Sequence, residues 1–127
     1  MTEVLLDTCV FAWSLQGTGQ LTPAARAAIT NASAIYLSPI SVFEITQKVR
    51  LGKWPAMASL SPYLTALPYL QLFTMAPLDA VICAAAGSMA WSHRDPFDRM
   101  IAATALQIGC PLVSSDKAFD GIVARIW

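Results

Sequence analysis

Half of the acidic residues in this chain lie where a domain of strands and helices could bring carboxylates together. The chain has eight Asp and Glu residues, and four of them follow predicted strands or lie in early turns of predicted helices: Asp7, Glu44, Asp98 and Asp116. At about 5 Å and an effective dielectric constant near 20, each charged pair would repel by roughly 3 kcal/mol. Protonation of some acids or a hard divalent cation would relieve this repulsion, and the cation is the simpler answer. Carboxylate oxygens and water suit Mg²⁺ or Mn²⁺ rather than zinc, so we expect a magnesium or manganese site.

Two of these acids end predicted strands. Asp7 follows the apolar run of residues 4–6, and Asp116 follows the run of residues 111–115 in the same way. In open α/β sheets, ligands bind outside the carboxyl ends of the strands, which favours a functional role for both acids. An N-cap for the helix expected over residues 8–15 is an equally open interpretation of Asp7.

The segment around Asp98 carries the signals of a helix start. Asp95 takes the N-cap position, Pro96 takes the first helical position, and Gly109 is the stop signal after a periodic apolar face. Asp98 lies outside that face. It is therefore either a carboxylate favoured by the helix dipole or a capping-box partner, or a carboxylate available to bind a metal ion. His93, the only histidine, has no second histidine to form a metal pair, and its place before the helix favours a loop or capping role.

Glu44 lies near the start of a helix predicted over residues 40–51. The pattern Ser41-x-x-Glu44 is that of a capping box, which would give Glu44 a structural task. Ser38 followed by Pro39 would cap the helix equally well, and Glu44 would then lie past the first turn without a capping task.

The rest of the chain alternates short strands with helices. Further strands are predicted over residues 34–37, 70–74 and 122–127, the last at the sheet edge, and further helices over residues 22–31, after residue 61, and over residues 80–90 behind an Asp79 cap. This order describes a single α/β domain over residues 1–127, with three layers and a mainly parallel sheet flanked by helices.

Composition limits the class of protein. Hydrophobic residues make up 56% and charged residues 13% of the 127-residue chain, which leaves apolar surface beyond one core and indicates self-association or a protein partner. The sequence predicts neither a membrane span nor a signal peptide. Three cysteines without CxxC spacing suggest neither disulfides nor zinc, so a cytoplasmic location fits best. The net charge is zero, so nucleic acid would have to bind a local basic patch.

Four motifs occur in order along nearly the whole chain: Asp7-Thr8, Ser38-Pro39-Ile40-Ser41-Val42-Phe43-Glu44-Ile45, Asp95-Pro96-Phe97-Asp98-Arg99 and Ser114-Ser115-Asp116. Together they resemble the PIN-domain ribonucleases, and in particular the VapC toxins of bacterial type II toxin–antitoxin modules. The resemblance implies a metal-holding acidic quartet made of Asp7, Glu44, Asp98 and Asp116. It also implies supporting roles for Thr8 and Ser114 and a structural cap at Asp95. Cys9 departs from the pattern, since relatives often have histidine there.

The function that follows is hydrolysis of RNA phosphodiester bonds with Mg²⁺ or Mn²⁺ as cofactor and water as the attacking group. The residues expected to hold the RNA backbone are Lys48, Arg50, Lys53, Arg94, Arg99 and Lys117. The resemblance further implies a homodimer and a cognate antitoxin that covers the site. The alternatives are a magnesium-binding phosphoacceptor domain and a non-catalytic α/β module that binds RNA or a partner.

Overall fold

The computed structural model describes residues 2–17, 19–70 and 72–127. Its centre is a five-stranded sheet in the order β3-β2-β1-β4-β5, and all neighbouring strands are parallel. The strands are β1 (Val4–Leu6), β2 (Ile35–Leu37), β3 (Thr74–Met75), β4 (Leu112–Val113) and β5 (Arg125–Ile126). Leu5 of β1 pairs with Tyr36 on one side and with Leu112 on the other, which makes β1 the central strand. The expected parallel sheet and the edge position of the last strand are confirmed.

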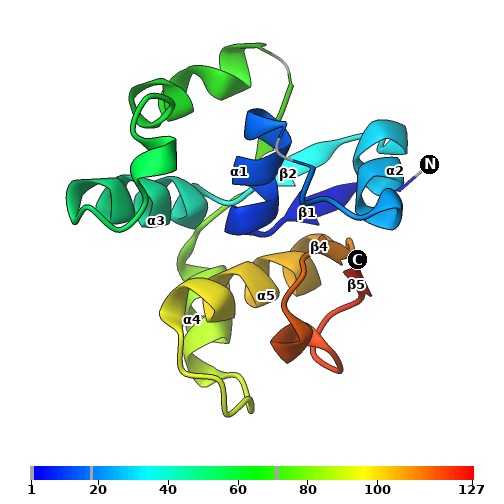
Figure 1. Ribbon diagram of the computed structural model, residues 1–127. Coiled ribbons are helices and arrows are strands. Elements are labelled where there is room, and N and C mark those ends of the chain that lie inside the picture. The colour runs from blue at the N-terminus through cyan, green and yellow to red at the C-terminus, as the bar shows by residue number, and fades with distance from the viewer. Residues whose placement is uncertain (1, 18, 71) are drawn as a thin grey trace.

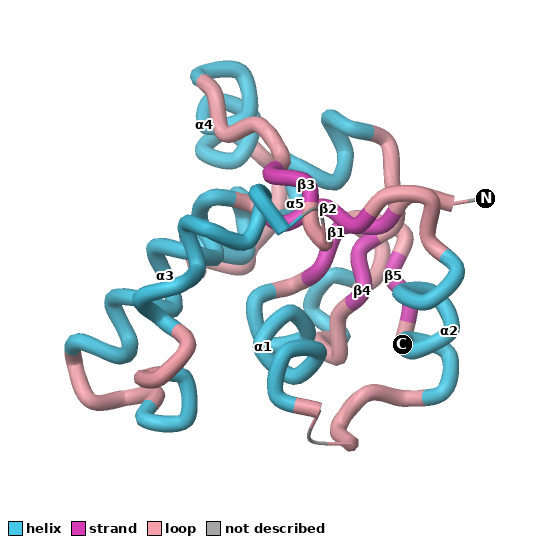
Figure 2. Tube along the Cα trace, turned by 90° about the horizontal axis from the view of Figure 1, so that it is seen from above, coloured by secondary structure: helices cyan, strands magenta, loops and turns pink. Residues whose placement is uncertain are grey.

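Helices cover both faces of this sheet (Figures 1 and 2). They are α1 (Thr8–Gln16), α2 (Pro23–Asn31), α3 (Pro39–Arg50), α4 (Ala80–Ser88) and α5 (Pro96–Ile108), with 3₁₀ helices over Pro55–Met57, Ser61–Leu70 and Lys117–Phe119. Successive side chains of a strand point to opposite faces. Leu6 accordingly belongs to a core cluster with Phe11 of α1. Leu5 belongs to a second cluster with Ile101 of α5, so the three-layer α/β architecture is confirmed.

Helix α5 begins as its sequence predicts. The carboxylate of Asp95 accepts hydrogen bonds from the backbone N–H groups of Phe97 (2.8 Å) and Asp98 (3.3 Å), and Pro96 occupies the first turn. Gly109 ends the helix with a positive φ of 70°, a conformation that costs glycine little. The assignment of Asp95 as the cap is therefore confirmed.

Asp95→Ala should lower the free energy of unfolding by about 0.5–2 kcal/mol, because two N–H groups of the first turn lose their acceptor. Asp95→Asn should retain most of that stability, since Asn caps helices as well as Asp does. Urea denaturation in EDTA would measure both. Equal stability of the wild type and the alanine variant would contradict the capping role.

The strand expected over residues 70–74 is wrong in position. β3 covers Thr74–Met75, because a ten-residue 3₁₀ helix, Ser61–Leu70, occupies the preceding segment. Leu64 and Leu67 are buried three residues apart in that helix. Side chains at i and i+3 lie above one another in a 3₁₀ helix, so this apolar spacing favours it. Residue 71 of the expected strand lies outside the described residues.

The boundaries of β5 and α4 also differ from expectation. β5 is limited to residues 125–126, because the N–H groups of Ile122 and Val123 both donate to the carbonyl of Phe119 in a turn. α4 ends at Ser88, two residues early, and the next residue leaves the helix with a ψ of 134°. Among the described residues, no helix has the length and apolarity needed to cross a bilayer.

Candidate active site

The four acidic residues lie at the carboxyl ends of strands or in the early turns of helices. Asp7 follows β1 and Asp116 follows β4, and these two strands are neighbours. Glu44 lies in the second turn of α3, which follows β2, and Asp98 lies in the first turn of α5. After burial, which has the largest effect, the charges of Asp98 and Glu44 raise the pKa of Asp7. The pKa of Asp98 is raised by burial and, to a smaller extent, by the charge of Asp116. Pairwise electrostatic interactions therefore connect all four acids.

Asp7 is the most strongly perturbed acid. Its Oδ1 accepts a hydrogen bond from the N–H of Thr8 (2.8 Å), and its Oδ2 accepts one from the hydroxyl of Ser114 (2.7 Å). Burial raises the pKa of Asp7 to about 6, although the Ser114 bond counteracts it. The same residue is the N-cap of α1. Its capping position and its raised pKa therefore coexist, and the two interpretations of Asp7 do not exclude each other.

Ser114 also links Asp7 to the turn that carries Asp116. The Ser114 hydroxyl oxygen accepts a hydrogen bond from the N–H of Asp116 (3.0 Å). Asp116 itself is exposed, and its Oδ1 caps the following 3₁₀ helix by accepting from the N–H of Ala118 (2.9 Å). Arg125, which sequence analysis did not single out, donates to the Ser114 carbonyl (3.1 Å) and fixes this turn from β5.

Glu44 lies past the capping region of α3. The hydroxyl of Ser38 accepts from the N–H of Ile40 (3.1 Å), so the Ser38 cap is the correct alternative and the capping box is wrong. The side chain of Glu44 is buried and pairs with Lys48 one turn later, at 2.7 Å. Sequence analysis considered Ser41 only for the capping box, whereas its buried hydroxyl lies 2.8 Å from that of Thr8 and connects α3 to α1.

Asp98 has a partner that sequence analysis also missed. The Nε2 of His93 lies 2.7 Å from its Oδ2. Burial raises the pKa of Asp98, and the His93 contact partly opposes that rise. The same contact raises the pKa of His93, so the imidazolium form is favoured. The signal available in the sequence was the spacing of five residues across a helix cap, which lets a loop side chain reach the first turn.

The basic residues expected to hold RNA differ in the contacts that they make. Arg50, Lys53, Arg94 and Lys117 are exposed. Lys48 pairs with Glu44, and its ammonium lies 5.6 Å from the centre of the Trp54 ring. Arg99 differs from the others because four of its N–H groups donate to backbone carbonyls, so the contacts that the structure describes for it are structural.

The donor set fits Mg²⁺ or Mn²⁺ in its chemistry, since it consists of carboxylates and a hydroxyl. In the part of the chain that the structure describes, no group of three or more His, Cys, Asp or Glu side chains is arranged to hold a metal ion. Glu44 and Asp98 instead contact basic side chains of the protein, Lys48 and His93. A divalent cation would supply positive charge beside Asp7 and would compete with Lys48 for Glu44. At Asp98 the His93 contact is made to Oδ2, so the cation would use Oδ1.

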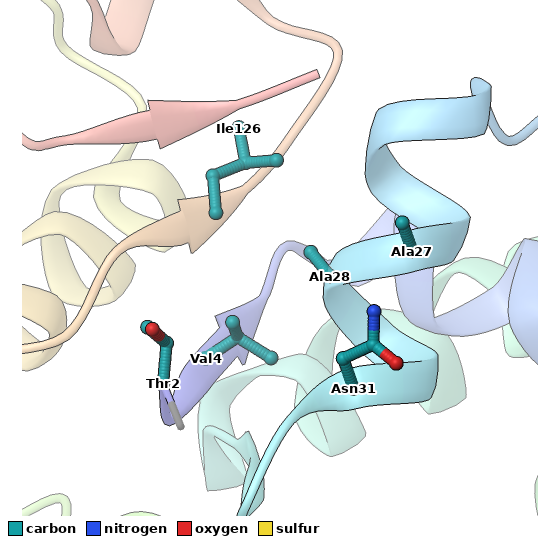
Figure 3. Close-up of a pocket in the computed structure, with 6 residues that line it drawn as sticks. All are labelled: Thr2, Val4, Ala27, Ala28, Asn31 and Ile126. Carbon is teal, nitrogen blue, oxygen red and sulfur yellow. The ribbon is translucent and has the colours of Figure 1, made fainter.

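A cavity of about 380 Å³ lies at the opposite end of β1 (Figure 3). Its lining comes from the start of β1, from α2 and from β5: Thr2, Val4, Ala27, Ala28, Asn31 and Ile126. None of these side chains is ionisable. The cavity therefore has no group for acid–base or metal chemistry. The candidate site is at the carboxyl ends of the strands, where the four acidic residues lie.

Comparison with known proteins identifies the family. The family model of the PIN domain matches residues 4–124, which include all four acidic residues. A comparison with curated proteins gives no match. Three similar solved structures cover nearly the whole fold. VapBC2 from Rickettsia felis bound to a promoter DNA fragment has a TM-score of 0.67 and 15% identity, over 98% of this chain and 97% of that chain. FitAcB from Neisseria gonorrhoeae has a TM-score of 0.62 and 27% identity, over 96% of this chain and 95% of that chain, and DNA-bound VapBC from Salmonella typhimurium has a TM-score of 0.63 and 20% identity, over 98% and 97%.

Proposed function

Because the chain belongs to the PIN-domain family, we propose that it is a ribonuclease and the toxin of a type II toxin–antitoxin pair. The observation that carries this proposal is the partly buried Asp7, whose pKa is raised to about 6 by desolvation and further by the charge of Asp98. Perturbed carboxylates of this kind cluster at functional sites. Similarity to VapBC and FitAcB structures supports the toxin assignment.

The acidic residues proposed to hold Mg²⁺ or Mn²⁺ are Asp7, Glu44, Asp98 and Asp116. When bound, such an ion supplies Lewis-acid chemistry to the scissile phosphate and activates water. The N–H of Thr8 and the hydroxyl of Ser114 hold both oxygens of Asp7, which fixes the orientation of that carboxylate. No protein side chain has to attack phosphorus.

The RNA backbone is proposed to contact the basic side chains that remain available: Lys48, Arg50, Lys53, Arg94 and Lys117. Lys48 connects this set to the acidic site, because it contacts Glu44 directly. With zero net charge, the protein would rely on this local group for attraction to phosphate.

RNA cleavage under Mg²⁺ or Mn²⁺ tests the proposal against its two rivals. We expect cleavage of total RNA by the purified chain, stopped by EDTA. Labelling by a phosphate donor without cleavage would favour the phosphoacceptor domain, although Asp7 lacks the adjacent acid that such domains usually show. RNA binding without either reaction would favour a non-catalytic module. Mapping the cleavage sites would then identify the RNA target.

The antitoxin should inhibit cleavage by covering apolar surface and the acidic site together. Large apolar side chains are exposed at Phe43, Leu51, Tyr63, Leu72, Val81 and Leu106, and part of this surface could bury an apolar helix of the partner. An arginine of that partner could bind two carboxylates in a bidentate manner. A homodimer would cover a further part of this surface. The homodimer and the cytoplasmic location stay predictions.

Co-purification with the product of the neighbouring gene would test the inhibitor. Cleavage should be absent in the complex and should appear after the partner is stripped off. Replacing the partner's basic residue should restore cleavage while leaving much of the apolar affinity. Equal cleavage with and without the partner would reject the toxin–antitoxin assignment but would leave the ribonuclease assignment intact.

A further inference from the structure

One side chain, Arg99, fastens the segment between α4 and α5 to the first turn of α5. Its Nε donates to the carbonyl of Ala86 (2.8 Å), its Nη2 to that of Met89 (2.8 Å), and its Nη1 to those of Trp91 (2.7 Å) and His93 (2.9 Å). A guanidinium offers five N–H donors in a rigid planar fork. A lysine ammonium, with three donors on one atom, cannot reproduce this set of bonds.

Two of the residues held by Arg99 determine where the imidazole of His93 lies. The His93 ring stacks against the ring of Trp91, with 4.9 Å between centroids and 38° between planes. The ring of Trp91 in turn packs against the ring of the buried Phe119, with 5.6 Å between their centroids. From this position the Nε2 of His93 reaches the Oδ2 of Asp98. The contacts therefore form a continuous path from Arg99 to one oxygen of Asp98.

We propose that Arg99 is a positioning residue of the acidic site. It holds the backbone of Trp91 and His93, these residues hold the imidazole on Asp98, and the imidazole fixes the orientation of the Asp98 carboxylate. The catalytic consequence rests on the proposed ribonuclease function, whereas the positioning of His93 does not. We place Arg99 outside the RNA and metal contacts, because four of its five N–H donors are directed at carbonyl groups of its own chain.

The first test is NMR of the untagged, metal-free full chain carrying Arg99→Lys. Because His93 is the only histidine, its ring signals are unambiguous. We expect the nuclear Overhauser effects between the rings of His93 and Trp91 to weaken or disappear, while the dispersed signals of the folded core persist. Unchanged ring contacts and ring shifts in this variant would overturn the proposal.

The second test is the kinetics of RNA cleavage. Arg99→Lys should lower kcat by about 10–100-fold, the range for groups that orient an active-site ligand, with KM changed less than twofold. Thr22→Ala is the control, because it removes the N-cap of α2, outside the site, and should lower stability but not kcat. A rise in KM alone would indicate an RNA contact, and an equal loss of kcat in both variants would indicate general destabilisation. Either result would overturn the proposal.

Trp91→Leu provides a second variant if Arg99→Lys does not fold. It removes the stacked ring but leaves the backbone carbonyls to Arg99, so the ring shifts of His93 should move and kcat should fall. Unchanged shifts and kcat would overturn the proposal. If the wild type cleaves no RNA, the proposed function fails, while the NMR measurement still decides whether Arg99 positions His93.

Discussion

RNA cleavage by the Asp98→Asn variant is expected to fall at least ~100-fold, beyond the loss typical of groups that only support a metal ligand. The substitution keeps the size of the side chain and removes the negative charge that Mg²⁺ or Mn²⁺ and His93 would both require. The fold should persist, because Asp95 rather than Asp98 caps α5. Cleavage of a defined RNA under single-turnover conditions with Mn²⁺ would measure the loss.

Asp79→Asn is the matched control for this result. Asp79 is also an aspartate at a helix start, and its Oδ1 accepts from the N–H of Ile82 at 3.0 Å in the N-cap of α4. Asn caps a helix equally well, so cleavage should be unchanged. Retained activity in Asp98→Asn would remove Asp98 from the site. Loss of activity in both variants would show sensitivity to any change at a helix start.

Helix starts could be predicted from the sequence because their signals are local. Three helices begin at a proline that follows a capping side chain, at Pro23, Pro39 and Pro96. A cap and a proline fix the first turn by backbone geometry alone, independently of the rest of the chain. The strands were harder to delimit, since β3 and β5 have two residues each and depend on pairing with neighbouring strands.

The contacts within the site could not be predicted in the same way, because they join distant parts of the chain. The Ser114–Asp7 hydrogen bond spans 107 residues, and the Thr8–Ser41 bond spans 33. Their residue types could be inferred from a family resemblance, but the pairing depends on strand order. Arg99 is the extreme case. Its partners are backbone carbonyls, which every residue has, so no side-chain pattern could indicate them.

Asp7→Asn should make the metal-free protein more stable above pH 7. Burial raises the pKa of Asp7 to about 6 in the folded state, although the hydrogen bond from Ser114 lowers it. An aspartate in the unfolded chain titrates near 3.8. Ionisation of Asp7 at neutral pH therefore costs the folded state about 3 kcal/mol. Asparagine is neutral at every pH and can keep an oxygen acceptor, so the variant should recover most of this free energy.

The pH dependence fixes the sign of this prediction. The folded state holds the Asp7 proton more tightly than the unfolded state does, so this stabilisation is full below about pH 4 and is lost as the pH rises through about 6. In urea denaturation with EDTA, the advantage of Asp7→Asn should be greatest near pH 8 and vanish near pH 4. Equal stability of both proteins at pH 8 would contradict the cost of burial. Mn²⁺ should stabilise only the wild type, because a cation that binds the folded state needs the carboxylate charge. Together these results would show that Asp7 lowers the stability of the metal-free protein and that its charge serves the proposed function.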